Sequence, residues 1–168
     1  MRLTLLALVA VLLVACRQEP EKPLMERLHA GHLNETDLKF VRDEFPGMTN
    51  ACVEKVRADG IDGMPNRTDE CFEMMPSQRW SGLWRNDLEG AVFCPDAPGK
   101  PVTKCPAAVP AIWFGPDGYE PDGGLYRVEF IGRRTVHAGK FGAYGAFPFE
   151  VVLDRMISKK LVERPSKD

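Results

Sequence analysis

The N-terminal segment decides which part of the chain can belong to a folded domain. Residues 3–14 are apolar except for Thr4, and Arg2 places a positive charge in front of them. Twelve residues are too few to cross a hydrocarbon layer as a helix, which takes about 20. A positive residue followed by an apolar run of this length is typical of an export signal. We therefore expect residues 1–15 to be a signal peptide, which leaves 153 of the 168 residues to form one domain.

The end of the apolar run is Leu13-Val14-Ala15-Cys16, which resembles a bacterial lipobox. In that motif the cysteine thiol receives a diacylglycerol before the chain is cut in front of the cysteine. The resemblance implies a lipoprotein held in a membrane by acyl chains, such as palmitate, on Cys16. Two or three chains would hold it nearly permanently, since each buried methylene contributes roughly 0.8 kcal/mol. An ordinary secretory signal with an unrelated cysteine is the alternative.

Residues 16–23 would then carry the lipid and a short tether. The segment is polar and charged, with prolines at positions 20 and 23, which suits an extended spacer. Position 17 is Arg, whereas an Asp there resembles an inner-membrane retention signal. We therefore expect the chain to lie in the bacterial outer membrane, facing the periplasm, with the lipid membrane as a partner.

Four cysteines remain once Cys16 is assigned to lipid: Cys52, Cys71, Cys94 and Cys105. An even number in an oxidising compartment indicates two disulfides, and four cysteines allow three pairings. We favour Cys52 with Cys71 and Cys94 with Cys105, because each pair encloses a segment rich in glycine or proline. A metal site is the weaker alternative, since the spacings match no zinc knuckle.

The composition argues against nucleic acid as a partner. Charged residues make up 27% of the chain and hydrophobic ones 44%, which is ordinary for a globular domain. The net charge of −2 becomes −3 once the segment with Arg2 is removed. Such a chain has no overall basic field to attract phosphates.

The first half, residues 24–78, is expected to be a small helical subdomain. Leu38, Val41 and Phe45 share one helical face, Asn34 is a plausible cap and Pro46 a stop. Further helical turns are expected at Leu24 to Leu28, at Val53 and Val56 after Thr49, and from Thr68, as a cap, through Cys71 and Phe72.

The second half, residues 79–164, is expected to be rich in strands. Along Leu125 to Ile131, Tyr126, Val128 and Phe130 alternate with Arg127 and Glu129. The other expected strands are Trp80 to Trp84, Leu88 to Phe93, Ala111 to Phe114, Phe149 to Leu153 and Met156 to Val162. We therefore expect an α+β fold: short helices, then a small antiparallel β-barrel or meander, OB-like if it closes, stapled by disulfides.

The stretch from Arg79 onward also carries a family resemblance. It is similar to small uncharacterised proteobacterial envelope lipoproteins through Arg79-Trp80-Ser81-Gly82-Leu83-Trp84, Glu89-Gly90, Phe93-Cys94-Pro95, Gly132-Arg133-Arg134-Thr135 and Val152-Leu153-Asp154-Arg155. The resemblance implies an envelope location and this type of domain, and it implies no activity.

Residues 132–147 form the most unusual segment, with basic residues followed by aromatic residues spaced by glycines. We take it as a candidate binding loop with five candidate residues: Arg133, Arg134, His137, Lys140 and Tyr144. The alternative is a long hairpin turn whose aromatic residues cover the end of the barrel. If the loop binds, replacing Arg133 and Arg134 with alanine should cost under about 1 kcal/mol of stability.

No metal or cofactor site is predicted. His29 and His32 have the i, i+3 spacing of two ligands on a helix, but Gly31 breaks the helix and no third ligand follows. Three acidic residues near the Pro-Asp-Gly turns do not match a calcium loop: Asp117, Glu120 and Asp122.

No catalytic residue is predicted either. Ser77, Ser81 and Ser158 lie in no nucleophile motif, and His137 lies in a polar segment. Glu89 and Asp154 would suit a glycosidase only if the fold set them the required distance apart. We therefore expect a non-enzymatic envelope lipoprotein that binds another envelope component, protein or glycan, or maintains the envelope. A cell-wall hydrolase and a structural surface lipoprotein are the alternatives.

Overall fold

The computed structural model describes residues 22–87, 91–105 and 112–164. Cys16 and Glu89, with the predicted signal peptide and most of the tether, lie outside these residues. The helices are α2 (Leu24–Ala30), α3 (Glu35–Glu44), α4 (Asn50–Asp59) and α5 (Thr68–Cys71), with a 3-10 turn, η1 (Ile61–Gly63). The strands are β1 (Gln78–Arg85), β2 (Val92–Pro95), β3 (Ile112–Trp113), β4 (Leu125–Arg134) and β5 (Phe149–Glu163), with η2 (Ala143–Gly145) before β5.

Two helices begin at side-chain caps. The Asn34 side chain accepts a hydrogen bond from the Asp37 amide, and the Thr49 side chain accepts one from the Cys52 amide, so each satisfies a free amide in a first helical turn. The predicted cap at Asn34 is confirmed. The predicted cap at Thr68 is wrong: Arg67 occupies the cap position of α5, and the Thr68 hydroxyl bonds to Glu150 instead.

The helices pack around their own small core. Leu38, Val41 and Val56 are fully buried there, with Leu28 and Val53 nearly so. The disulfide between Cys52 and Cys71 is buried in the same cluster and ties α4 to α5. Within the described residues, no helix is long and apolar enough to span a membrane.

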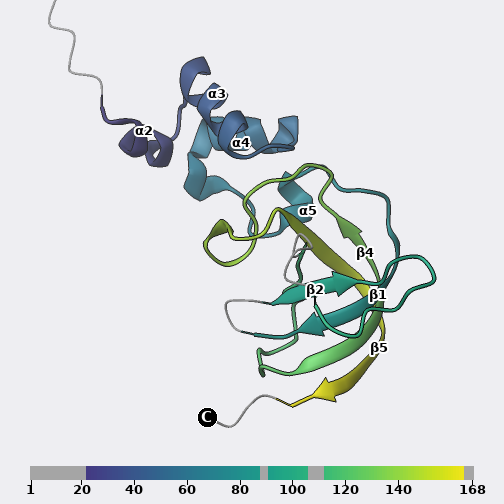
Figure 1. Cartoon of the computed structure of the whole chain (residues 1–168). Helices are drawn as coiled ribbons and strands as arrows, with labels where there is room; N and C mark the ends of the chain where they lie inside the picture. The colour runs from purple at the N-terminus through teal and green to yellow at the C-terminus, as the bar shows by residue number, and fades with distance from the viewer. Residues whose placement is uncertain (1–21, 88–90, 106–111, 165–168) are drawn as a thin grey trace, which may run out of the picture.

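The five strands close into a ring in the order β1-β2-β3-β5-β4, with β4 paired back to β1 (Figure 1). The predicted α+β fold is confirmed, and of the two predicted arrangements of strands, barrel or meander, the described strands form the barrel. One pairing differs from a purely antiparallel barrel, because Ile112 and Trp113 of β3 run parallel to Phe149 and Glu150 of β5. Figure 1 shows the helices near one end of the barrel and the end of β5 at the other.

Aromatic rings fill the barrel. Phe114 and Phe130 stack with ring centroids 4.4 Å apart, and Phe93 packs against both. The predicted alternation along β4 is confirmed, since Val128 and Phe130 are buried whereas Arg127 and Glu129 form ion pairs at the surface.

The last strand is longer than predicted. Phe149 to Leu153 and Met156 to Val162 form one strand, β5, rather than two. Its pairing with β4 shifts register at three places, which skip Asp154, Ile157 and Val162. Each skip reverses which face the following residues occupy, so the alternation in the sequence is interrupted although the strand continues.

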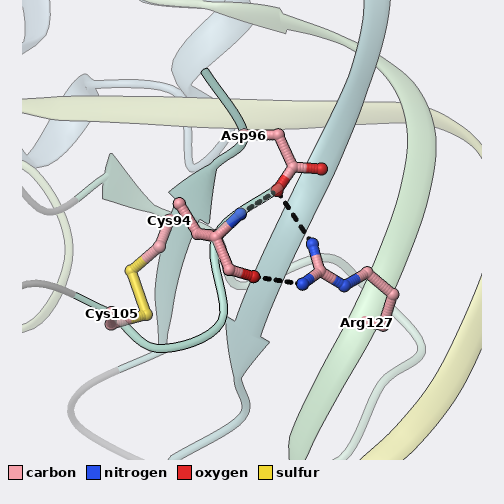
Figure 2. The surroundings of a disulfide bond; sticks show 5 residues. Cys94, Asp96, Cys105 and Arg127 are labelled. Atoms are coloured by element: carbon pink, nitrogen blue, oxygen red, sulfur yellow. Dashed lines mark hydrogen bonds and ion pairs between the residues drawn. A yellow bond between two sulfur atoms is a disulfide. The ribbon is translucent and has the colours of Figure 1, made fainter. Parts of the chain in front are cut away.

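The second disulfide, between Cys94 and Cys105, closes the loop that follows β2. Next to it, the Asp96 carboxylate accepts hydrogen bonds from Arg127 and from the Val102 amide, each 2.8 Å long (Figure 2). Arg127 also donates to the Val102 carbonyl. This loop is therefore held both by its covalent bridge and by an arginine from β4. Both favoured disulfide pairings are present.

Candidate functional site

A pocket of about 420 Å³ lies where α5 meets β3 and the start of β5. The twelve residues that line it come from three segments: Asn66, Arg67, Thr68 and Asp69; Trp113, Gly115, Pro116 and Asp117; and Glu150, Val151, Val152 and Leu153. The pocket exists because β3 ends at Trp113, opposite Glu150, and the chain then turns away through Gly115 and Pro116. The residues of β5 from Glu150 to Leu153, which have no β3 residue beside them after Glu150, line the pocket.

Glu150 is held in place by both its backbone and its side chain. Its carbonyl accepts a 2.9 Å hydrogen bond from the Thr135 amide, and its carboxylate accepts a 2.8 Å bond from the Thr68 hydroxyl. Burial raises the pKa of Glu150, and the nearby charge of Asp69 acts in the same direction, against the Thr68 bond. Glu150 therefore keeps its proton to a higher pH than an exposed glutamate does.

Asp69 is the opposite case. Its side chain is only 8% exposed, and it forms 2.8 Å ion pairs with Arg67 and Arg133. Burial alone would raise the pKa of Asp69, but the hydrogen bonds from Arg133 and Arg67 outweigh it and leave the pKa below its ordinary value. Asp69 is thus a fixed, neutralised charge at the edge of the pocket.

Trp113 has little room to move. A Cβ atom at Gly142 would lie 2.5 Å from the indole ring, and one at Gly115 would lie 3.1 Å from it. Phe147 packs against the same ring, with centroids 5.2 Å apart. Glycine is required at Gly142, because a Cβ there would clash with the ring and because φ is +67°, a conformation that favours glycine. The Gly142 backbone therefore packs directly against the indole.

The indole N–H of Trp113 differs from those of the other two tryptophans. The Trp80 N–H donates to the Gly132 carbonyl, and the Trp84 N–H donates to the Phe114 carbonyl. Among the described residues, no acceptor is found for the indole N–H of Trp113. A tryptophan fixed in a pocket wall with an unused donor is suited to bind a ligand oxygen.

The predicted binding residues do not gather in this pocket. Arg133 pairs with Asp69 and Asp154, and Arg134 lies over the Phe149 ring at 4.4 Å. His137 lies 3.2 Å from Glu73, Lys140 pairs with Glu44, and Tyr144 is 90% exposed. The cations of this segment therefore link the barrel to residues of the helical half and to its own strands.

Two of the remaining candidates bond to side chains outside the pocket. His29 pairs with Asp62 at 3.0 Å, and Asp154 bonds to Ser77 and Arg133. In the described part of the chain, no group of three metal-ligating side chains comes together. Glu89, the proposed partner of Asp154, lies outside the described residues.

Sequence reasoning did not single out Trp113 or Glu150. Neither lies in a motif, and each acquires its role from segments distant in sequence: Thr68 and Glu150 are 82 residues apart. A search with the whole chain found no matching family model, curated protein or solved structure.

Proposed function

We propose that the chain is a lipoprotein anchored through Cys16 in the outer membrane, whose domain binds an envelope component, protein or glycan, without transforming it. The pocket between α5, β3 and β5 is the proposed site. The observation that carries the proposed binding site is that the Trp113 indole is fixed against Gly142 while its N–H has no acceptor among the described residues. The two disulfides support an oxidising compartment such as the periplasm.

The test is capture of envelope components by the purified full-length chain from detergent-solubilised membranes. Asp117→Trp places a large side chain at an exposed position of the pocket wall. Lys100→Trp makes the same change at an exposed position in a second hollow, next to Asp96. We expect the first variant to lose the captured component and the second to keep it. Equal capture by both variants and the unmodified chain would exclude the pocket as the site.

A hydrolase is the second candidate, because one observation favours it. Glu150 and Asp69 line the same pocket with pKa values moved in opposite directions, as in enzymes that use one carboxyl as acid and another as base. Binding remains the better proposal because both Asp69 oxygens accept bonds from arginines, which leaves that carboxylate poorly placed to take a proton.

The two candidates are separated by an assay on purified peptidoglycan. The chain and its Glu150→Gln variant are incubated with the polymer, and soluble fragments are measured. If the chain binds without transforming its ligand, neither releases fragments. Release by the chain that is lost in Glu150→Gln would replace the binding proposal with the hydrolase.

A further inference from the structure

We propose that the ligand of this pocket is a neutral saccharide, bound through the Trp113 indole N–H and the polar side chains that line the pocket around it. This inference rests on the proposed binding function and names its ligand class. It is carried by the unused donor, by the mixture of donors and acceptors around it, and by the balance of charge in the pocket.

The unused donor is the first step. The Trp113 N–H lies on the side of the ring next to Gly115, whose missing side chain leaves that edge uncovered. Gly115 itself is exposed and lines the pocket. A ligand that supplies an oxygen there gains a hydrogen bond without displacing one within the protein.

The polar lining is the second step. The Thr68 hydroxyl already donates to Glu150, so its lone pairs remain free to accept a further bond. Asn66 offers both a donor and an acceptor, and Asp117 offers acceptors. Sugar hydroxyls both donate and accept hydrogen bonds, so a saccharide can satisfy such a mixed set, whereas an apolar ligand would leave these groups unpaired.

The balance of charge is the third step. Arg67 and Arg133 each form an ion pair with Asp69, so both cations are already used within the protein. A phosphate or other anion would still meet the carboxylate of Asp117 and gain no free cation in return. Among the described residues that line it, the pocket therefore offers hydrogen-bonding groups and carboxyl groups but no cation free to pair with a ligand, which favours a neutral ligand over an anionic one.

The test follows the three indole N–H resonances of the full-length chain by NMR. The probes are three neutral trisaccharides, the β-1,4-linked trimer of N-acetylglucosamine, cellotriose and maltotriose, with trigalacturonic acid as the anionic comparison. We expect at least one neutral probe to shift the Trp113 resonance saturably. The Trp80 and Trp84 resonances should stay in place, because their N–H groups are bonded within the protein.

Two substitutions provide the control. Trp113→Phe removes the donor but keeps a ring, and we expect it to weaken binding roughly two- to tenfold, followed through the backbone amides of the pocket. Trp80→Phe makes the same change outside the pocket and should leave the affinity unaltered.

Absence of a saturable Trp113 shift with every neutral probe would overturn the saccharide inference, as would tighter binding of trigalacturonic acid. In that case, the proposed function would still be supported if Asp117→Trp lost the captured envelope component while Lys100→Trp kept it. The two failures are therefore distinguishable.

Discussion

The Thr68 hydroxyl donates a 2.8 Å hydrogen bond to the Glu150 carboxylate, and this bond joins the last helix to the first residues of the last strand. The Glu150 backbone is also bound to Thr135, the residue that follows β4, so these contacts link α5, β5 and the end of β4. The same two residues line the pocket. A substitution at this junction would therefore change both the stability of the fold and the wall of the pocket.

Thr68→Val should lower the free energy of unfolding by about 1–2 kcal/mol, because the shape is kept while a half-buried carboxyl loses its donor. Thr68→Ser, which keeps a hydroxyl, is the control and should cost much less. Urea unfolding at pH 7 measures both. A valine variant as stable as the unmodified chain would show that this bond contributes nothing net.

Glu150→Gln should change how stability depends on pH. Because burial raises the pKa of Glu150 above its ordinary 4.5, the folded state holds this proton more tightly than the unfolded state. The contribution of Glu150 is therefore fully present below pH 4.5 and is lost as the pH rises through the folded pKa. Glutamine does not titrate, so the stability gained by the variant over the unmodified chain should grow as the pH is raised from 4 towards neutrality.

Asp69 gives the reference of opposite sign for that experiment. Its folded pKa lies below the ordinary 3.8, so its contribution is present above pH 3.8 and is lost as the pH falls through the folded pKa. The difference between the unmodified chain and Asp69→Asn should therefore shrink on acidification. If the Glu150→Gln difference followed the same direction, the assignment of a raised pKa to Glu150 would be wrong.

Arg133→Ala should destabilise the fold by about 1–3 kcal/mol, since it removes the charged hydrogen bonds to Asp69 and Asp154. Arg134→Ala should cost less, about 0.5–1 kcal/mol, because Arg134 lies over the Phe149 ring without an ion pair among the described contacts. Sequence alone predicts less than about 1 kcal/mol for the two changes together. Thermal melts of both variants decide between the two expectations, and a destabilised Arg133→Ala would remove that residue from any recognition loop.

Reduction should affect both disulfides, each of which contributes roughly 3 kcal/mol in the loop-entropy description. We expect loss of the bridge between Cys52 and Cys71 to unfold the helical half first, because this bridge is part of its small buried core. Serine pairs at each bridge, compared by hydrogen exchange, test this. For the variant that lacks the bridge between Cys94 and Cys105, we expect faster amide exchange only in the loop after β2.

Cys16→Ser should abolish lipid labelling and processing to the mature size if Cys16 is the lipid anchor. The folded domain should be unaffected, since the structure places helices and strands only from Leu24 onward within the described residues. Metabolic labelling with a radioactive fatty acid, together with gel mobility, measures both. A processed, acylated Cys16→Ser protein would remove the proposed anchor.

Local features were the ones that the sequence could predict. The cap at Asn34 depends on a residue three positions away, and Cys94 and Cys105 are only 11 positions apart in the sequence. The alternation of Val128 and Phe130 likewise appears within a few residues. Each of these signals is contained in a short window, so it survives without knowledge of the fold.

The pocket could not be predicted, because its parts meet only after the barrel has closed. From the sequence alone, Thr68 is predicted to cap a helix. Its hydroxyl bonds to Glu150 instead, a partner that only the fold brings beside it. The cations near Arg133 suggest a binding loop until Asp69, 64 positions away, is seen to neutralise one of them. Long-range partners of this kind leave no periodic signal in the sequence.

The circular order of strands also determines when this domain can finish folding. β5 supplies a neighbour to both β3 and β4, and it is the most C-terminal strand of the described chain. A chain that emerges N-terminus first can form its helices early, but the pairings of β5 with β3 and with β4 cannot form until β5 has emerged. Until then, β3 and β4 expose unpaired edges that invite aggregation or proteolysis. A version cut short before Phe149 should therefore behave as an unfinished sheet in need of a chaperone rather than as a smaller barrel.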